Sequence, residues 1–199
     1  MNIEKAKKEL AYYMRRLYRR GLTTTLGGNI SMRLTDGTII ITPSATDKAR
    51  MTAKDIGITD IDGNILGALF NPSIETGMHL AVYRARPDVN AVVHAHPVTA
   101  CAFAASSKQI NCSMIIESSV LLQEIAYADY HEMGSADLAE SVASAVENTD
   151  AVIMRNHGAV TLGTDITIAF ERLEALENAA RMTVIAETAL GSTLSLIGN

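Results

Sequence analysis

The sequence predicts an α/β protein with a single domain, in which helices cover the faces of a mixed sheet. Segments with helical spacing of apolar residues alternate with hairpin signals and short apolar strands along the chain. Apolar residues make up 48% and charged residues 20% of the chain, which is ordinary globular composition. Its 199 residues suffice for one substantial core, so we expect one domain over residues 1–199.

The first third of the chain is expected to contain a helix and two hairpins. Apolar residues at three- and four-residue steps predict an amphipathic helix over 3–17, with Gly21 placed as a glycine that ends a helix. Alternating apolar residues on both sides of an Asp-Gly turn predict a hairpin over 30–42. A second hairpin is predicted by the strand-like residues 58–61, the Asp-Gly-Asn turn and the residues from Ile65 onward.

The rest of the chain alternates helices with short apolar strands. Proline and serine mark several boundaries, because proline cannot continue a helix and serine favours the position before its first turn. The elements expected in order are a helix over 74–86 closed by Pro87, a strand over 91–94, a helix from Pro97 to about 106, a helix from Ser135 to 147, strands over 151–154 and 159–162, and a helix from Asp165 to about 190.

Composition and charge argue against nucleic acid or a membrane as partner. The chain has 17 Lys and Arg against 22 Asp and Glu, a formal charge of −5, and no basic run to neutralise phosphates. No stretch of about 18 apolar residues is present, and the Lys- and Glu-rich start does not resemble a secretory signal. Cys101 and Cys112 lack metal or disulfide spacing. A cytoplasmic protein acting on a small molecule is therefore expected.

Three of the five histidines suggest a metal site. His94 and His96 flank Ala95 at the end of an apolar strand, and residues two apart in a strand point to the same side. His157 follows another apolar strand, and functional groups gather at strand ends in α/β sheets. Three imidazoles with a fourth position open are typical of catalytic zinc, although manganese, cobalt and nickel also suit them. The alternative is that the pair and His157 are structural.

Glu75 is the carboxylate expected to accompany the ion. It lies at the predicted start of the helix over 74–86, where the helix dipole favours an anion. The alternative is an ordinary glutamate at a helix start. His79, four residues later, is interpreted as structural. The loops 27–29 and 42–46 are rich in backbone and hydroxyl donors, which can bind phosphate but also serve hairpin turns.

Five short motifs together resemble the class II aldolase and adducin-head family. Each motif alone is unspecific, but all five occur in the family's order and spacing, and the resemblance covers about residues 5–190. The motifs are Gly27-Gly28-Asn29-Ile30-Ser31, Thr42-Pro43-Ser44, Pro72-Ser73-Ile74-Glu75, His94-Ala95-His96 and Arg155-Asn156-His157-Gly158.

The resemblance implies a fold, a metal and an activity. It implies a three-layer α/β/α fold with a mixed, largely antiparallel sheet, and a homotetramer with sites near subunit interfaces. It implies a zinc-like ion on the three histidines, Glu75 as ligand or base, and cleavage of a ketose 1-phosphate, such as L-fuculose 1-phosphate, to dihydroxyacetone phosphate and an aldehyde. The phosphate-binding positions implied are Gly28, Asn29, Ser44 and Ser73.

Several positions depart from the fuculose-phosphate aldolase pattern. Ala45 replaces a glycine, Ile74 a serine, and Ile115 stands near the position of a tyrosine acid. Glu117 could supply that proton-transfer group, as a glutamate does in related dehydratases, or be a surface or interface carboxylate. The alternatives are a sugar-acid-phosphate decarboxylase, a thiosugar-phosphate dehydratase, a pentulose-phosphate 4-epimerase and, outside enzymes, an adducin-like interaction module.

Overall fold

Seven strands form one mixed sheet in the order β3-β2-β1-β4-β7-β6-β5. The computed structural model describes residues 2–190 and residue 197. Every neighbouring pair of strands is antiparallel except β5 and β6, which are parallel. The strands are β1 (Asn29–Arg33), β2 (Ile39–Ile41), β3 (Gly57–Thr59), β4 (Ala91–Ala95), β5 (Ala126–Ala128), β6 (Ala151–Met154) and β7 (Gly158–Gly163).

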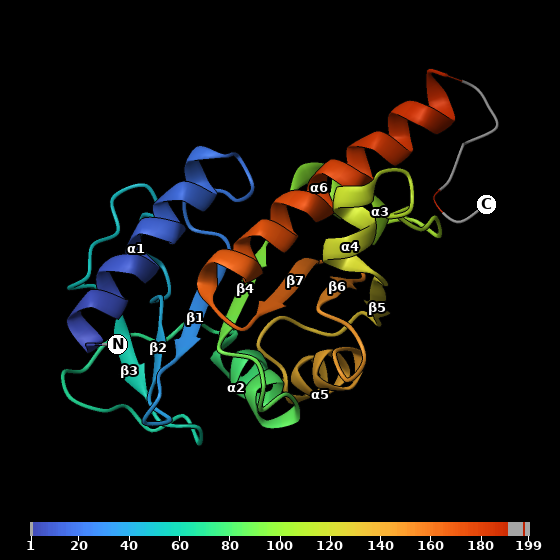
Figure 1. Cartoon of the computed structure of the whole chain (residues 1–199). Helices are drawn as coiled ribbons and strands as arrows, with labels where there is room; N and C mark the ends of the chain where they lie inside the picture. The colour runs from blue at the N-terminus through green and yellow to red at the C-terminus, as the bar shows by residue number, and fades with distance from the viewer. Residues whose placement is uncertain (1, 191–196, 198–199) are drawn as a thin grey trace.

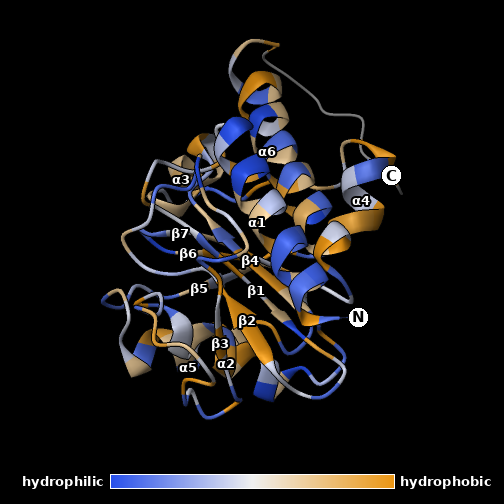
Figure 2. Cartoon of the chain, turned by 90° about the vertical axis from the view of Figure 1, so that its left-hand side faces the viewer, coloured by the Kyte–Doolittle hydropathy of each residue, from blue (hydrophilic) through white to orange (hydrophobic). Residues whose placement is uncertain are grey.

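Helices cover both faces of this sheet and give three layers. In Figure 2, α1, α3, α4 and α6 lie on one side of the strands, while α2 and α5 lie on the other. Figure 1 shows α6 running across the sheet as the longest helix. The helices are α1 (Ile3–Arg19), α2 (Thr76–Ala85), α3 (Val98–Ala104), α4 (Ile116–Leu122), α5 (Ala136–Ala145) and α6 (Ile166–Thr188). The expected α/β/α architecture is confirmed.

The sheet separates two hydrophobic cores, one under each helical layer. All five residues of β4 are buried. Val92 and Val93, which are adjacent in this strand, point into different cores because strand side chains alternate. One core gathers the apolar faces of α1, α3 and α6, and the other those of α2 and α5. A central strand buried on both faces fixes the position of the residues that follow it, and these include His96.

The second hairpin predicted from the sequence is present in a short form. The chain reverses at the expected turn, where the Asp60 carboxylate accepts hydrogen bonds from the backbone of Asp62 and Asn64, at 3.0 and 2.9 Å. Ile65 forms an antiparallel bridge with Thr59, and Leu66 N donates to Ile58 O at 2.9 Å. The pairing stops there, so the second arm is not a strand, and β3 pairs along its length with β2.

Two short elements, α4 and β5, were not predicted, and one helix starts later than expected. α2 begins at Thr76, so Ile74 lies outside it and is 57% exposed, whereas Glu75 is the residue that precedes the helix. The other predicted helices and strands are present within about two residues of their expected ends. Ser135 and Asp165 cap α5 and α6 through their side chains, as their positions in the sequence indicated.

The expected single domain over 1–199 stays a prediction, and residues 1, 191–196, 198 and 199 lie outside the described part of the chain. Within that part, no helix combines the length and the apolar character needed to cross a membrane.

Candidate metal centre and active site

His94, His96 and His157 meet at one edge of the sheet. His94 lies in β4, His96 directly follows that strand, and His157 lies in the loop between β6 and β7. One possible ligand atom from each lies within 4.8 Å of the others. The ring centroids of His94 are 4.8 Å from those of His96 and 5.0 Å from those of His157. The structure thus brings together the three histidines that the sequence singled out.

Glycines make room for these imidazoles. A Cβ atom on Gly158 would lie 2.6 Å from Ala95 O and 2.6 Å from His96 Cδ2, and one on Gly27 would lie 3.0 Å from His96 Nδ1. Gly28 has a φ of +68°, and a Cβ there would lie 2.9 Å from the backbone oxygen of His94. A larger side chain at Gly158 would therefore displace the histidines themselves.

The ring of His94 is fixed with its free nitrogen toward the centre. Its Nδ1 donates to the backbone oxygen of Ala159 at 3.0 Å, so in the neutral ring Nε2 carries a lone pair. That Nε2 lies 3.1 Å from Oε2 of Glu75, and Nε2 of His157 lies 3.0 Å from Oε1. These close contacts are not hydrogen bonds. His94 Nε2, His157 Nε2 and Glu75 Oε1 are therefore buried without a hydrogen-bond partner.

This cluster of buried atoms fits a divalent cation. Buried polar atoms nearly always have a partner, and here two imidazole nitrogens and a carboxylate oxygen converge without one. Burial lowers the pKa of His96 to about 4, with the neighbouring histidines as further causes, so its ring is neutral near pH 7. Neutral imidazole is the form that ligates metals. His94, His96 and His157 could therefore hold the ion, with Glu75 beside it.

A buried chain of hydrogen bonds leads away from Glu75. Oε2 of Glu75 accepts from Nδ2 of Asn29 at 2.9 Å, and Oδ1 of Asn29 contacts Nε2 of His79 at 2.6 Å. Nδ1 of His79 contacts Ser31 Oγ at 2.7 Å, which contacts the Tyr83 hydroxyl at 2.8 Å. The residues come from β1 and α2, and on α2 His79 and Tyr83 are four apart, on the same helix face.

The donor and the acceptor of each of these hydrogen bonds follow from the Glu75 carboxylate, at which the series ends. A carboxylate only accepts, so the Asn29 amide donates to Glu75 and its oxygen accepts from Nε2–H of His79. Nδ1 of His79 then accepts from Ser31, whose oxygen accepts from Tyr83. Burial lowers the pKa of His79 to about 3, which keeps its ring neutral as this scheme requires. Successive donors thus point toward Glu75 and hold its orientation.

Glu75 is a carboxylate in this environment. Burial raises its pKa, but the His94 and His157 imidazoles and the Asn29 amide lower it more, and the pKa lies below its ordinary value. The side chain is only 3% exposed. Glu75 is therefore a buried anion, oriented by donors and held beside the three histidines.

The segments expected to bind phosphate lie side by side. Two hydrogen bonds join the segment 27–31 to the segment 42–44. Thr42 N donates to Ile30 O at 3.0 Å, and Ile30 N donates to Thr42 Oγ1 at 3.1 Å. Pro43 and Pro72 form an antiparallel bridge, and Ser44 N donates to Asn71 O at 2.9 Å, so the segment that contains Ser44 runs beside the one that contains Ser73. Asn29 lies within this group, but its side-chain amide is used by Glu75 and His79.

Glu117 does not join the histidines of its own chain. It is exposed in the first turn of α4 and lines a hollow together with Arg16, Arg20 and Glu174 from α1 and α6. A role for Glu117 in proton transfer stays a prediction, and it would have to act on the site of a neighbouring subunit.

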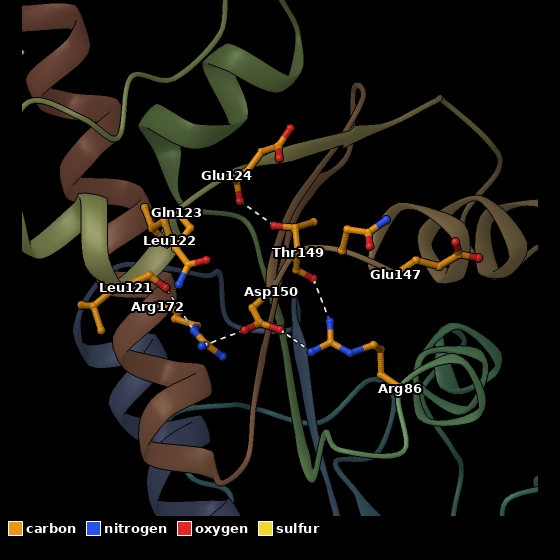
Figure 3. Close-up of a pocket in the computed structure, with 10 residues that line it drawn as sticks. Arg86, Leu121, Leu122, Gln123, Glu124, Glu147, Thr149, Asp150 and Arg172 are labelled. Atoms are coloured by element: carbon orange, nitrogen blue, oxygen red, sulfur yellow. Dashed lines mark hydrogen bonds and ion pairs between the residues drawn. The ribbon is translucent and has the colours of Figure 1, made fainter. Parts of the chain in front are cut away.

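A hollow of about 390 Å³ lies at the other end of β6, where Asp150 precedes the strand that leads to His157 (Figure 3). Arg86 and Arg172 line it, but both guanidinium groups are already bound to Asp150, at 2.9 and 2.7 Å. The two also donate to backbone oxygens, Arg86 to Thr149 at 3.2 Å and Arg172 to Leu162 at 2.7 Å. These ion pairs hold the end of α2 and the helix α6 against the sheet, and they leave neither guanidinium group free for a ligand.

Fold and site together define a metal-centred α/β/α protein with a carboxylate beside three imidazoles. Residues 8–184 match the class II aldolase and adducin N-terminal domain family. The chain belongs to this family.

Named relatives and a solved structure agree with this assignment. The chain is 41% identical over 172 residues to an L-fuculose phosphate aldolase of Methanococcus maripaludis, covering 86% of this chain and 92% of that one. It is 30% identical over 183 residues to a 3-oxo-tetronate 4-phosphate decarboxylase of Haemophilus influenzae, covering 89% and 86% of the two chains. A solved L-fuculose 1-phosphate aldolase superposes with a TM-score of 0.88 at 30% identity, covering 96% of this chain and 90% of that one.

Proposed function

We propose that this chain is a metal-dependent aldolase that cleaves a ketose 1-phosphate of the L-fuculose 1-phosphate type into dihydroxyacetone phosphate and an aldehyde. The observation that carries the proposal is the convergence of three imidazoles and the Glu75 carboxylate on one cluster that contains buried atoms without hydrogen-bond partners. The 41% identity to an L-fuculose phosphate aldolase over most of both chains supports the choice of substrate.

The ion and the carboxylate have different tasks in this scheme. A divalent ion on His94, His96 and His157 would supply a Lewis acid for the substrate's carbonyl and hydroxyl oxygens. In the direction of synthesis, Glu75 accepts a proton from C3 of dihydroxyacetone phosphate. In cleavage, a second proton-transfer group takes the proton of the C4 hydroxyl as the C3–C4 bond breaks, and Glu75, protonated by exchange of that proton, gives a proton to C3. The chain from Tyr83 to Asn29 keeps the carboxylate turned toward the reacting carbon.

The far end of the substrate would be held by phosphate-binding loops. We assign this role to Gly28, Asn29, Ser44 and Ser73, whose segments lie together beside Glu75. Asn29 would contribute through its backbone, because its amide group is already engaged. Binding energy at the phosphate orients the reacting centre.

The metal, the compartment and the assembly follow from the family resemblance as part of what we propose. The ion is zinc, with manganese, cobalt or nickel as substitutes, and the chain forms a cytoplasmic homotetramer. Glu117, exposed on its own subunit, would serve as second proton-transfer group in a neighbouring site.

A decarboxylase of sugar-acid phosphates is the second candidate, since a relative 30% identical carries that name. A dehydratase and a 4-epimerase follow. Retention of three imidazoles and a buried carboxylate disfavours an adducin-like interaction module, in which no such chemistry is needed. A panel of ketose 1-phosphates and sugar-acid phosphates, scored for dihydroxyacetone phosphate and carbon dioxide, separates these activities.

Glu75→Gln tests the carboxylate. We expect kcat to fall by about 10²-fold or more, because proton transfer by a positioned side chain contributes roughly that much. Glu117→Gln is the matched variant: a decrease only in the assembled oligomer supports its assigned role. Unchanged turnover in Glu75→Gln would remove Glu75 from the mechanism.

Chelation tests the ion. Removing bound metal should abolish cleavage, and added zinc, manganese or cobalt should restore it. Full activity in protein shown to be metal-free would contradict the proposal.

A further inference from the structure

Lys48 is a buried lysine without an acidic partner. It is 1% exposed, and it is the only buried lysine or arginine among the described residues. Its Nζ donates to the backbone oxygen of Pro43 at 3.0 Å, and no ion pair to a carboxylate of the described residues is present. The adjacent Asp47 carboxylate is used by Ala49 N at 2.9 Å and faces Arg50 at 3.8 Å. One of the three donors of the ammonium is therefore used.

The position of Lys48 links the three loops assigned to phosphate. Its backbone N–H donates to Thr25 O at 2.9 Å, just before the Gly27–Asn29 loop. Its side chain reaches Pro43, next to Ser44, and Pro43 bridges to Pro72, next to Ser73. Lys48 thus contacts one loop directly, the residue that leads into the second, and the third through a single bridge.

Burying a cation without a counter-charge is costly, and the cost is reduced when an anion binds nearby. Burial lowers the pKa of Lys48 to about 8, so the side chain is mainly protonated at neutral pH. Serine hydroxyls and backbone N–H groups supply hydrogen bonds to a phosphate dianion, but no full charge. A buried ammonium behind these loops would supply it, and its field is screened less than that of a surface lysine.

We propose that Lys48 is a positioning residue that makes the site selective for phosphorylated substrates, by tying the three loops together and placing a positive charge behind the phosphate. This inference rests on the proposed function in one respect, namely that the loops at Ser44 and Ser73 take the phosphate of the substrate.

Lys48→Met tests the inference, because methionine keeps an unbranched stem and removes the charge. Lys54→Met is the matched control: Lys54 is exposed six residues later and its loss changes the net charge by the same unit. Inorganic phosphate is titrated into the metal-loaded full-length protein by calorimetry. We expect the phosphate affinity to fall at least tenfold in Lys48→Met and to stay unchanged in Lys54→Met. Equal affinities in all three proteins would overturn the proposal.

Kinetics separates a charge for phosphate from a merely structural lysine. In Lys48→Met we expect KM for a ketose 1-phosphate to rise at least tenfold, with kcat within about threefold, and the slow cleavage of the unphosphorylated ketose to be unaffected. If turnover of the ketose 1-phosphate and of the unphosphorylated ketose falls by the same factor while phosphate affinity is retained, Lys48 only stabilises the loops, and the proposal is rejected.

A measurement on the unmodified protein covers the case in which Lys48→Met does not fold. In protein labelled with ¹³C at lysine Cε, the buried lysine should titrate at lower pH than the exposed ones, and saturating phosphate should shift its midpoint upward. An unmoved midpoint contradicts the proposal. If phosphate binds in a Lys48-dependent way but no ketose 1-phosphate is cleaved, the assigned aldolase activity fails while the role of Lys48 stands.

Discussion

The two ends of β6 carry clusters of charged and polar groups that differ in how their atoms are partnered. Before the strand, Asp150 lies between Arg86 and Arg172, and each guanidinium is also bound to backbone oxygens. After the strand, His157 and its neighbours point bare nitrogen and oxygen atoms at one another. The first cluster satisfies itself and stabilises the fold, whereas the second is complete only when something binds. Unsatisfied buried atoms, rather than the size of a hollow, locate the site in this protein.

The glycines at the two ends of β7 test this contrast with the largest expected effect. In Gly158→Ala the new Cβ would lie 2.6 Å from His96 Cδ2, so the histidines must move. We expect metal affinity to fall by about 10–100-fold, the size of effect seen when ligands lose their support. Calorimetric titration with zinc measures it.

Gly163→Ala is the control at the other end of the strand. Its Cβ would lie 2.5 Å from Ala169 N, at the start of α6 and away from the histidines. We expect the free energy of unfolding to fall by about 1–3 kcal/mol from overpacking, with zinc affinity retained. If both substitutions weaken zinc binding equally, the two ends are not independent.

His79→Gln tests the buried chain through the pH dependence of stability. The pKa of His79 is about 3 in the folded protein against 6.5 for an ordinary histidine, so between these values the unfolded chain binds more protons. Stability therefore decreases as pH falls from 6.5 toward 3, by about 1.4 kcal/mol per pH unit from this group. Glutamine cannot titrate, so denaturant unfolding of the variant should show a shallower slope. The same slope in both proteins would refute a neutral buried His79.

Asp150→Asn should affect stability and leave the chemistry alone. Its partners Arg86 and Arg172 are about a fifth exposed, so the loss lies between surface and buried ion pairs, at about 1–3 kcal/mol. Thermal unfolding measures this loss. A changed kcat/KM for ketose 1-phosphate cleavage would show that the two clusters communicate.

Ala45→Gly should give the smallest effect. Ala45 has a φ of +49°, in the left-handed region that favours glycine, and it lies beside Ser44. Relief of this strain is partly offset by the entropy that glycine loses on folding, so we expect a gain of about 0.5–1 kcal/mol. Chemical denaturation checks the sign, and a loss of stability would show that Ala45 contributes packing.

The cluster of three histidines could be predicted from the sequence because the patterns that indicate it are local. His94 and His96 lie at the end of one apolar strand and His157 follows another, and strand ends are recognisable without knowing how the strands pair. The roles of Asn29 and His79 were missed as partners of Glu75, because β1 and α2 meet only in the folded chain. One signal was available: Glu75, His79 and Tyr83 are spaced four apart, so all three share a helix face.

Short elements and pairing partners were harder to predict. α4 has seven residues and β5 three, too few for a periodic pattern to stand out. The arm that starts at Ile65 pairs with β3 through a single bridge, whereas β3 pairs along its length with β2. Local patterns specify which segments are strands more readily than which strands pair.

We expect His94, His96 and His157 to bind one divalent ion. The most direct measurement is the metal content of the full-length protein after reconstitution with zinc and removal of excess ion, compared with His157→Ala. The account predicts one ion per chain in the unmodified protein and almost none in the variant, with ketose 1-phosphate cleavage following the metal. Equal metal content in both proteins, or none in either, would contradict it.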